Sequence, residues 1–216
     1  LSGDWSSDVC SSDLLARRIG RWLGISEGLD LSSLLGGQQV AVADIGASLG
    51  FHPRWGQLGP NLRMLLFEPQ EEECARLREL YAADPRIVLH NVALSEHGGK
   101  IKIHVNSWPY STSAFEHDRA FFDRLAMRGF YEKRCEIEMD SRSLDSVVTE
   151  EVDFVKLDIE GYELPVLRGG LRCLSSCVGI ESEVSYVRWA DGLPLFGDID
   201  AFCKEQGFTL CRIGPP

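Results

Sequence analysis

Short apolar runs alternate with segments of helical periodicity along most of this chain. Apolar runs bounded by glycine, proline or charged residues are typical of buried strands. We expect such strands over residues 39–45, 62–67, 87–90, 152–157, 178–184 and 208–213. Apolar residues recur at helical spacing in residues 70–81, 161–168 and 198–206. This alternation predicts an α/β fold, with a mostly parallel sheet that carries helices on both faces.

Residues 100–105 and 135–139 follow a different pattern, in which apolar and polar residues alternate. Alternation with period two is typical of antiparallel strands, so we expect an antiparallel insertion at about 100–140. Inside the insertion, residues 118–128 have the pattern of a helix, and residues 15–23 predict another helix at the domain edge. Because no stretch resembles a linker, we expect residues 15–216 to form a single domain.

The N-terminal segment is set apart by its sequence. Residues 4–14 read DWSSDVCSSDL, which matches, codon for codon, the translation of a common sequencing adapter. We therefore treat residues 1–14 as a non-native, adapter-derived tail and expect them to make no defined contacts with the domain. We also expect the C-terminal strand of the sheet to be truncated, because the chain stops soon after residue 213.

Composition narrows the range of functions. The chain has 216 residues, 44% of them hydrophobic and 25% charged, which suits a globular domain with a sizeable core. No run reaches the roughly 18 apolar residues of a membrane span. The net charge of -11 argues against nucleic acid as the main partner, because phosphate contacts need clustered Lys and Arg. Outside the tail the cysteines form no CxxC pair, so we expect reduced thiols and a cytoplasmic location.

Polar residues follow the ends of the predicted strands, where ligands bind in parallel α/β sheets. Glu68 follows the second strand, where it is suited to accept two hydrogen bonds from a ribose diol. The first strand ends in the glycine turn DIGASLG, which contains Asp44, Gly46, Ala47, Ser48 and Gly50. Glycines allow a close approach of the backbone to a ligand. Taken alone, a glycine turn and an acidic residue are typical of any nucleotide-binding sheet of this kind.

The fourth predicted strand brings further carboxylates to the same edge, in the string KLDIEGYE at residues 156–163. This string follows DIGASLG, FEP, NVALS and SLDSV in order along the chain. Together the five strings resemble those of the FkbM-type methyltransferases. The resemblance implies a Rossmann-like class I methyltransferase fold and S-adenosylmethionine as the cofactor.

The resemblance also assigns residues to the cofactor by matching position. The residues expected to contact it are Asp44, Gly46, Ala47, Ser48, Gly50, Phe67, Glu68, Pro69, Asn91, Val92 and Asp158. Those after the first strand are expected to hold the methionine part, and those after the second to hold and cover the ribose. Those after the third strand are expected to border the adenine. Asp158 is expected to face the sulfonium, since a carboxylate favours a cation.

The reaction that the resemblance implies is O-methylation of a hydroxyl, on a small-molecule or glycan acceptor such as a sugar or a natural product. An alcohol is a poor nucleophile until its proton leaves, so a general base helps, and no metal is needed. The candidate bases, in order of preference, are Asp158, Glu160 and Glu183. Trp108, Tyr110 and Trp189 are candidates for lining an acceptor pocket, although loop aromatics are as often local core.

Some features leave alternatives open. Ser48 stands where Asn is usual in the family, and residues 52–61 are shorter and more polar than its usual first helix. Glu163 is as readily a solvated helix residue as a site residue. An NAD(P)-binding Rossmann oxidoreductase is one other function, but it would need a GxGxxG turn, and Ser48 occupies the place of the middle glycine. A catalytically degenerate cofactor-binding domain is the other.

Overall fold

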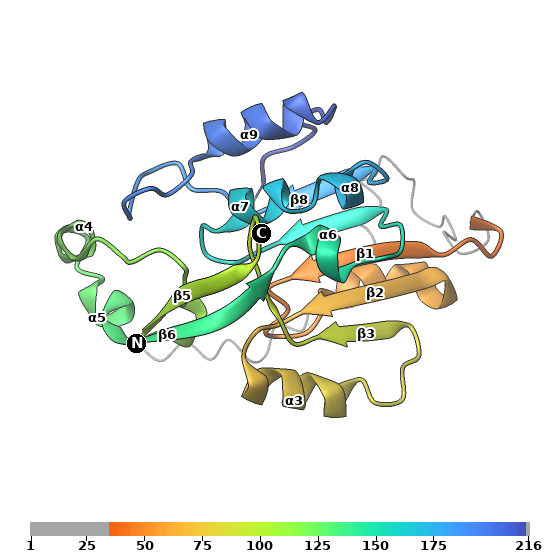
Figure 1. Cartoon of the computed structure of the whole chain (residues 1–216), viewed down its shortest axis with the longest axis horizontal. Helices are drawn as coiled ribbons and strands as arrows, with labels where there is room; N and C mark the ends of the chain where they lie inside the picture. Colours follow the sequence, from red (N-terminus) through yellow and green to blue (C-terminus); the bar gives the residue numbers. More distant parts are fainter. Residues whose placement is uncertain (1–34, 215–216) are drawn as a thin grey trace.

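Five parallel strands form the central sheet of the protein (Figure 1). The computed structural model describes residues 35–214 of the chain. The strands are β1 (Val40–Ile45), β2 (Leu62–Phe67), β3 (Ile87–His90), β7 (Phe154–Leu157) and β8 (Gly179–Ser182). Their order is β3-β2-β1-β7-β8, and each neighbouring pair runs parallel. The predicted α/β fold with a mostly parallel sheet is confirmed, and its strand order reverses at β1, the usual place for a ligand.

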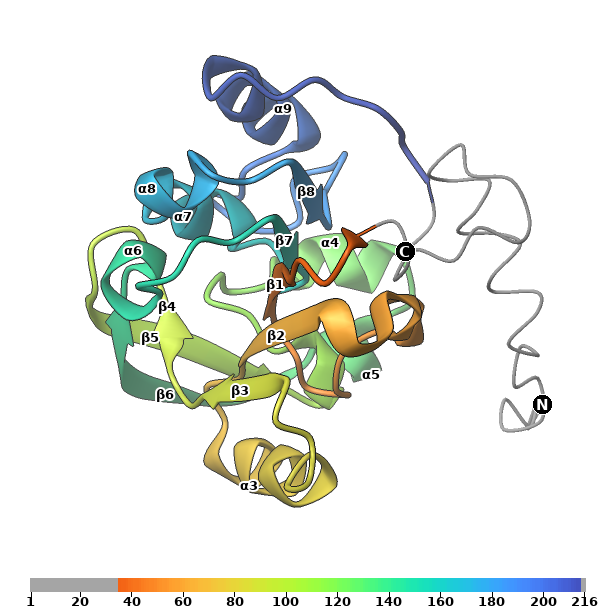
Figure 2. The same cartoon turned by 90° about the vertical axis from the view of Figure 1, so that its right-hand side faces the viewer.

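Both faces of this sheet are covered, which explains why its strands have nearly unbroken apolar sequences. On one face, Ile45, Phe67 and Leu157 belong to a core that includes residues of four helices. These helices are α6 (Leu144–Val147), α7 (Glu163–Arg168), α8 (Leu171–Leu174) and α9 (Phe196–Glu205). Figure 2 shows this helical layer beside β7 and β8, with α9 outermost.

The opposite face has a smaller core built on Val42, Met64 and Leu66. It is covered by the 3₁₀ segment η1 (Pro53–Asn61) and by Tyr81, the residue that caps α3 (Glu71–Leu80). Three glutamates occupy the first turn of α3, where negative charge interacts favourably with the helix dipole. The polar stretch at residues 52–61 thus takes the place of the family's longer first helix. It forms the 3₁₀ segment η1, which is kinked at Gly59.

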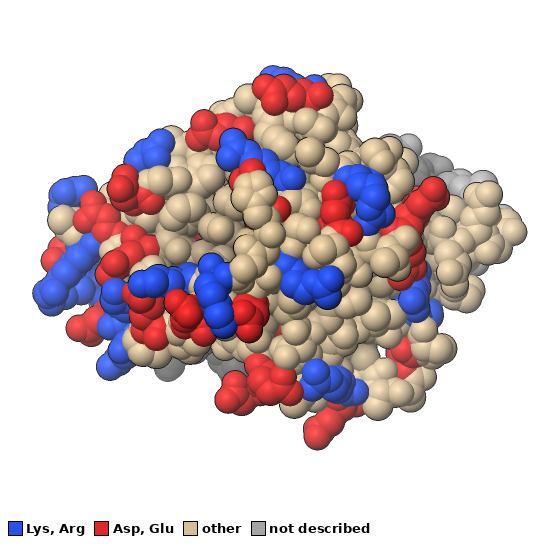
Figure 3. Space-filling view, viewed as in Figure 1, with Lys and Arg blue, Asp and Glu red and all other residues tan. Residues whose placement is uncertain are grey.

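The predicted insertion forms a second sheet with the order β4-β6-β5. Its strands are β4 (Ala93–Leu94), β5 (Gly99–Asn106) and β6 (Lys133–Arg142). As expected from the alternation, β5 and β6 pair antiparallel. Figure 3 shows Lys and Arg side by side with Asp and Glu over this ribbon, and Lys100 pairs with Asp140 at 2.7 Å. The tip carries η2 (Pro109–Ser111), α4 (Arg119–Arg124) and α5 (Arg128–Tyr131).

Two predicted elements are wrong. Residues 208–213 form no strand: Phe208 packs on the core, but Leu210 and Ile213 are exposed and the described sheet ends at β8. The helix predicted at 118–128 is split into α4 and α5, because Ala126 between them has a left-handed φ of 56°. The tail at 1–14 and the helix predicted at 15–23 lie outside the described residues. Among the described helices, none has the length and apolar character to cross a membrane.

Candidate functional site

The carboxyl ends of the central strands meet at the edge of the sheet that faces the insertion. The arrowheads of β1, β2 and β3 in Figure 1 point toward the side on which α4 and α5 lie. Several contacts join the insertion to this edge. Ser113 Oγ donates a hydrogen bond to the carbonyl of Glu160, and His117 forms an isolated β-bridge with Ala190.

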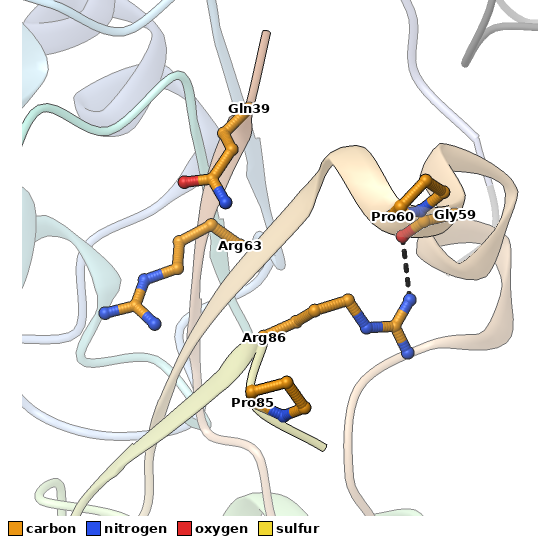
Figure 4. A pocket seen from close by; sticks show the side chains of 6 residues that line it. All are labelled: Gln39, Gly59, Pro60, Arg63, Pro85 and Arg86. Atoms are coloured by element: carbon orange, nitrogen blue, oxygen red, sulfur yellow. Dashed lines mark hydrogen bonds between the residues drawn. The ribbon is translucent and has the colours of Figure 1, made fainter. Parts of the chain in front are cut away.

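An open hollow lies at the opposite edge, beside the amino ends of β1, β2 and β3 (Figure 4). Its two arginines already have partners. Arg86 donates to the carbonyl of Gly59 at 2.7 Å, and Arg63 lies 3.4 Å from Glu150. The hollow contains no carboxylate, nucleophile or glycine turn that follows a strand. We therefore place the candidate site at the carboxyl ends, where the sequence predicted it.

The glycine turn after β1 is shaped by close contacts within the protein. Gly46 has a φ of 85°, and a side-chain carbon at this position would lie 2.0 Å from the carbonyl oxygen of Asp158. Gly50 has a φ of 87°, and a carbon there would lie 2.3 Å from the hydroxyl of Tyr81. The amides of Gly46 and Ala47 both donate to the carbonyl of Phe67. The turn therefore joins β1 to both neighbouring strand ends.

Asp44, at the tip of β1, is almost fully buried beside a lysine. Lys156 Nζ lies 3.1 Å from Asp44 Oδ1 and 3.5 Å from Asp158 Oδ2, so the ammonium lies between the two carboxylates. The contact with Asp44 is an ion pair without the alignment of a hydrogen bond. Burial raises the pKa of Asp44 to about 6, against the opposing charge of Lys156. Arg54 lowers that pKa as well, and a further positive charge near Asp44 would lower it more.

The ion pair continues as a row of alternating charge across the sheet. Asp44 on β1 is level with Lys156 on β7, and Lys156 is level with Glu181 on β8. Arg54 of η1 then forms an ion pair with Glu181. The polar segment in place of the first helix thus supplies the last charge of this row. Each charge has an opposite neighbour, which is how buried charges are tolerated.

The second strand end provides Glu68, which is 2% exposed. Its Oε1 accepts the amide of Gln70 at 2.8 Å, and burial raises its pKa to about 7. Asn91 donates from its side-chain amide to the carbonyls of Glu68 and Pro69. The side chain of Phe67 lies in the core, stacked on His90 at 4.8 Å, so its carbonyl is the part nearest the glycine turn.

Asp158, Glu160 and Glu183 come together as a cluster of three carboxylates. One oxygen of each lies within 4.8 Å of the others. Burial and the charge of Glu183 raise the pKa of Glu160 to about 8. Although Glu183 as a whole is exposed, desolvation and the charge of Asp158 raise its pKa to about 7. Such spacing is also within the range of ligands for a hard cation, so the expectation that no metal takes part calls for a direct test.

The loop that carries Glu160 is held by hydrogen bonds. Glu160 has a φ of 57°, which is uncommon for a residue other than glycine. The buried carboxylate of Glu163 accepts the amides of Ile159 at 3.0 Å and Gly161 at 3.2 Å. Glu163 is therefore a support of this loop and not a solvated helix residue.

Aromatic side chains surround the same edge. Trp189 is half-buried and stacks on His117, with ring centroids 4.4 Å apart. Tyr131 stacks on Phe122 at 3.9 Å, and burial, together with the charges of Glu160 and Glu183, raises its pKa. By contrast, Trp108 and Tyr110 are exposed. Of the three aromatic residues suggested by the sequence, only Trp189 lies against the carboxylate loop, next to Gly161.

The sequence did not point to Lys156 or Ser113 as parts of this site. Lys156 had a signal, because it lies two residues before Asp158, and side chains at that spacing share a face while the chain stays extended at the end of β7. Ser113 had none, because it reaches Glu160 from 47 positions away in the chain.

Comparison with known families assigns the chain to one of them. The family model described as the methyltransferase FkbM domain matches residues 44–210. The chain belongs to the FkbM methyltransferase family. The match begins at Asp44 and includes all three residues of the carboxylate cluster. Membership of a methyltransferase family does not support the nicotinamide-dependent alternative.

Two individual proteins resemble the chain. The 2-O-methyltransferase NoeI of Sinorhizobium fredii (strain NBRC 101917 / NGR234) is 29% identical over 181 residues, which cover 78% of this chain and 73% of NoeI. The crystal structure of methyltransferase FkbM from Methylobacillus flagellatus KT is 23% identical, with a TM-score of 0.41. The match covers 64% of this chain and 30% of that one, so this chain spans less than a third of the solved protein.

Proposed function

We propose that the protein is an S-adenosylmethionine-dependent O-methyltransferase that acts on a hydroxyl of a sugar or natural-product acceptor. The observation that carries the proposal is the gathering of Asp44, Glu68 and the Asp158 cluster at one edge of the sheet of an FkbM family member. When bound, the cofactor supplies an electrophilic methyl group on a sulfonium. The residues of the chain bind the cofactor, orient the acceptor and remove the proton of its hydroxyl.

The buried carboxyl groups of the site fit a cationic nucleoside ligand. Asp44 and Glu68 are buried carboxylates with raised pKa values, and a cation beside them would stabilise their charged forms. We assign Asp44 and the turn from Gly46 to Gly50 to the methionine part, and Glu68 to the ribose hydroxyls. Asn91 and Val92 border the adenine in this assignment, and the Phe67 ring supports the ribose site from within the core.

The structure changes our order of preference for the general base. Asp158 lies beside the Lys156 ammonium and next to the glycine turn, a position suited to the cofactor. Glu160 and Glu183 have pKa values near 8 and 7, close to neutral pH, where a general base works best. We therefore assign proton removal first to Glu160, with Glu183 as its neighbour, and the sulfonium end to Asp158.

Two observations support a sugar or natural-product hydroxyl as the acceptor. The curated relative is named a 2-O-methyltransferase, which makes a hydroxyl the acceptor group in that protein. In this chain, Trp189 and Tyr131 lie beside the carboxylate loop, and aromatic faces with a polar edge suit sugars as well as other ring systems.

Calorimetric titration with S-adenosylmethionine, and with NAD as the control, tests the proposal. We expect binding of S-adenosylmethionine alone. Transfer of labelled methyl groups to a panel of oligosaccharides and aglycone alcohols, with and without EDTA, then tests the reaction, the acceptor and the metal. Binding without transfer to any acceptor would favour the degenerate cofactor-binding domain, and binding of neither ligand would reject the proposal.

A further inference from the structure

Ser113 joins the insertion to the loop that bears Glu160. The side chain is buried, and its hydroxyl donates to the carbonyl of Glu160 at 2.6 Å while accepting the amide of Phe115 at 3.0 Å. Its backbone is fixed as well, since Ser113 and His104 exchange two hydrogen bonds of 2.8 and 3.2 Å. The pairing with His104 of β5 and the amide of Phe115 therefore fix the position of the hydroxyl that contacts Glu160.

The Glu160 backbone needs such a contact. Glu160 and Gly161 have φ values of 57° and 96°, so two successive residues lie in the left-handed region. Only the second of them is a glycine, for which this conformation is ordinary. The carboxylate of Glu163 holds the amides on either side, at Ile159 and Gly161. The hydrogen bond from Ser113 holds the carbonyl of Glu160 itself.

The same part of the insertion also holds the segment that follows Glu183. The amide of Asp118 donates to the carbonyl of Trp189 at 2.8 Å, and His117 pairs with Ala190 in a β-bridge. Residues 113–118 thus contact both loops whose carboxylates meet in the cluster.

We propose that Ser113 is a positioning residue that sets Glu160 in register with Glu183 and the acceptor hydroxyl. This inference rests on the proposed function, because it assigns proton removal to Glu160. Ser113 touches no reacting atom, and it acts through the backbone of the loop.

Ser113→Ala tests the proposal, with Ser107→Ala as the matched control. Ser107 is in the same insertion, and its hydroxyl also donates to a carbonyl, that of Glu132 at 3.1 Å, but it makes no hydrogen bond to the loop of Glu160. We expect kcat to fall roughly 10- to 100-fold in Ser113→Ala, the scale of a small misplacement of a catalytic group. Cofactor affinity and the KM for the acceptor should be unchanged. Ser107→Ala should leave all three constants unchanged.

The pH profile separates positioning from loss of folded protein. Glu160 is faced by Asp158 and Glu163 of its own loop, by Glu183 after β8 and by Tyr131 of α5. When the loop is released, Glu160 moves away from Glu183 and from the buried site, so its pKa should fall. The midpoint of the rise in kcat with pH should therefore shift to lower pH in Ser113→Ala. A smaller fraction of folded enzyme would lower kcat without moving the midpoint.

Carbon-13 NMR of glutamate-labelled protein decides the question independently of activity. The Glu160 signal is assigned by its loss in Glu160→Gln, and it should titrate at lower pH in Ser113→Ala than in the parent. An unchanged titration of Glu160 would overturn the positioning role, whether or not the parent transfers methyl groups. An inactive parent would reject the proposed function alone. If Ser113→Ala does not fold, Ser113→Cys keeps the shape with a weaker donor and should show the same shift to a smaller degree.

Discussion

Two side chains at the strand ends have a carboxyl group removed almost entirely from water. Asp44 is 1% exposed and Glu68 is 2% exposed, and burial is the largest cause of the raised pKa of each. Lys156 offsets part of this effect at Asp44, whereas Glu68 has the amide of Gln70. Carboxyl groups in such surroundings favour a ligand that brings hydrogen-bond donors or positive charge.

Replacement of Glu68 by Ala is expected to weaken S-adenosylmethionine binding by about 2 to 4 kcal/mol, because two charge-assisted hydrogen bonds to the ribose are lost. Calorimetric titration measures the change in the dissociation constant, and circular dichroism verifies the fold. Glu72→Ala is the matched control, since Glu72 is exposed in the first turn of α3. A dissociation constant equal to that of the parent would reject Glu68 as the ribose ligand.

Glu160→Gln removes the proposed base and keeps the size of the side chain. We expect kcat to fall at least about a hundredfold, the usual scale for loss of a general base, with little change in cofactor affinity. In the parent, kcat should rise with pH through the pKa of Glu160, about 8, because the base acts in its deprotonated form. Glu138→Gln, on the exposed face of β6, is the control. Asp158→Asn should instead weaken cofactor binding, and a larger loss of kcat there than in Glu160→Gln would reverse the two roles.

At the scale of elements, the turn after β1 depends on glycine. Gly46→Ala would place a carbon 2.0 Å from the carbonyl of Asp158, in a left-handed conformation that costs about 1 to 2 kcal/mol before any clash. We expect the free energy of unfolding in urea to fall by more than about 2 kcal/mol. In Gly56→Ala, within η1, the added carbon meets nothing within 4 Å, so stability should hardly change. Equal stability of the two variants would show that the loop at Asp158 moves aside.

The sequence predicted the strands of the central sheet within a few residues, because strands buried on both faces leave unbroken apolar runs. Residues 208–213 have a similar pattern, but a pattern cannot tell whether a neighbouring strand is present to pair with. The carboxylates at the strand ends could be predicted because parallel strands bring their ends to one edge. The support of Glu160 by Ser113 could not, because that hydrogen bond depends on how the insertion folds back onto the sheet.

At the scale of the whole molecule, the site adds negative charge to a chain whose net charge is already -11. The folded protein raises the pKa of Asp44 to about 6, of Glu68 and Glu183 to about 7, and of Glu160 to about 8. Folding therefore makes these carboxyls hold protons that the unfolded chain has already released. Some histidines have the opposite effect below their ordinary pKa of 6.5, because they hold fewer protons in the folded state. An example is His117, whose pKa burial lowers to about 4. The carboxyls dominate between about pH 6.5 and 8.

Because the folded state binds more protons than the unfolded state in this window, its stability should fall as the pH rises from about 6.5 to 8. S-adenosylmethionine, a cation, should stabilise the charged carboxyls, so its stabilising effect should grow over the same window. Urea unfolding at several pH values, with a saturating concentration of ligand, measures both trends. S-adenosylhomocysteine, which keeps the ammonium and the ribose but lacks the sulfonium charge, is the matched ligand, and its stabilising effect should grow less over this window. Glu160→Gln should flatten the slope of the ligand-free protein, since it removes a carboxyl whose pKa is raised to about 8. Parallel curves for the two ligands would mean that neither Glu160 nor Glu183, which titrate in this window, senses the sulfonium, and the carboxylate cluster would then not lie at that end of the cofactor.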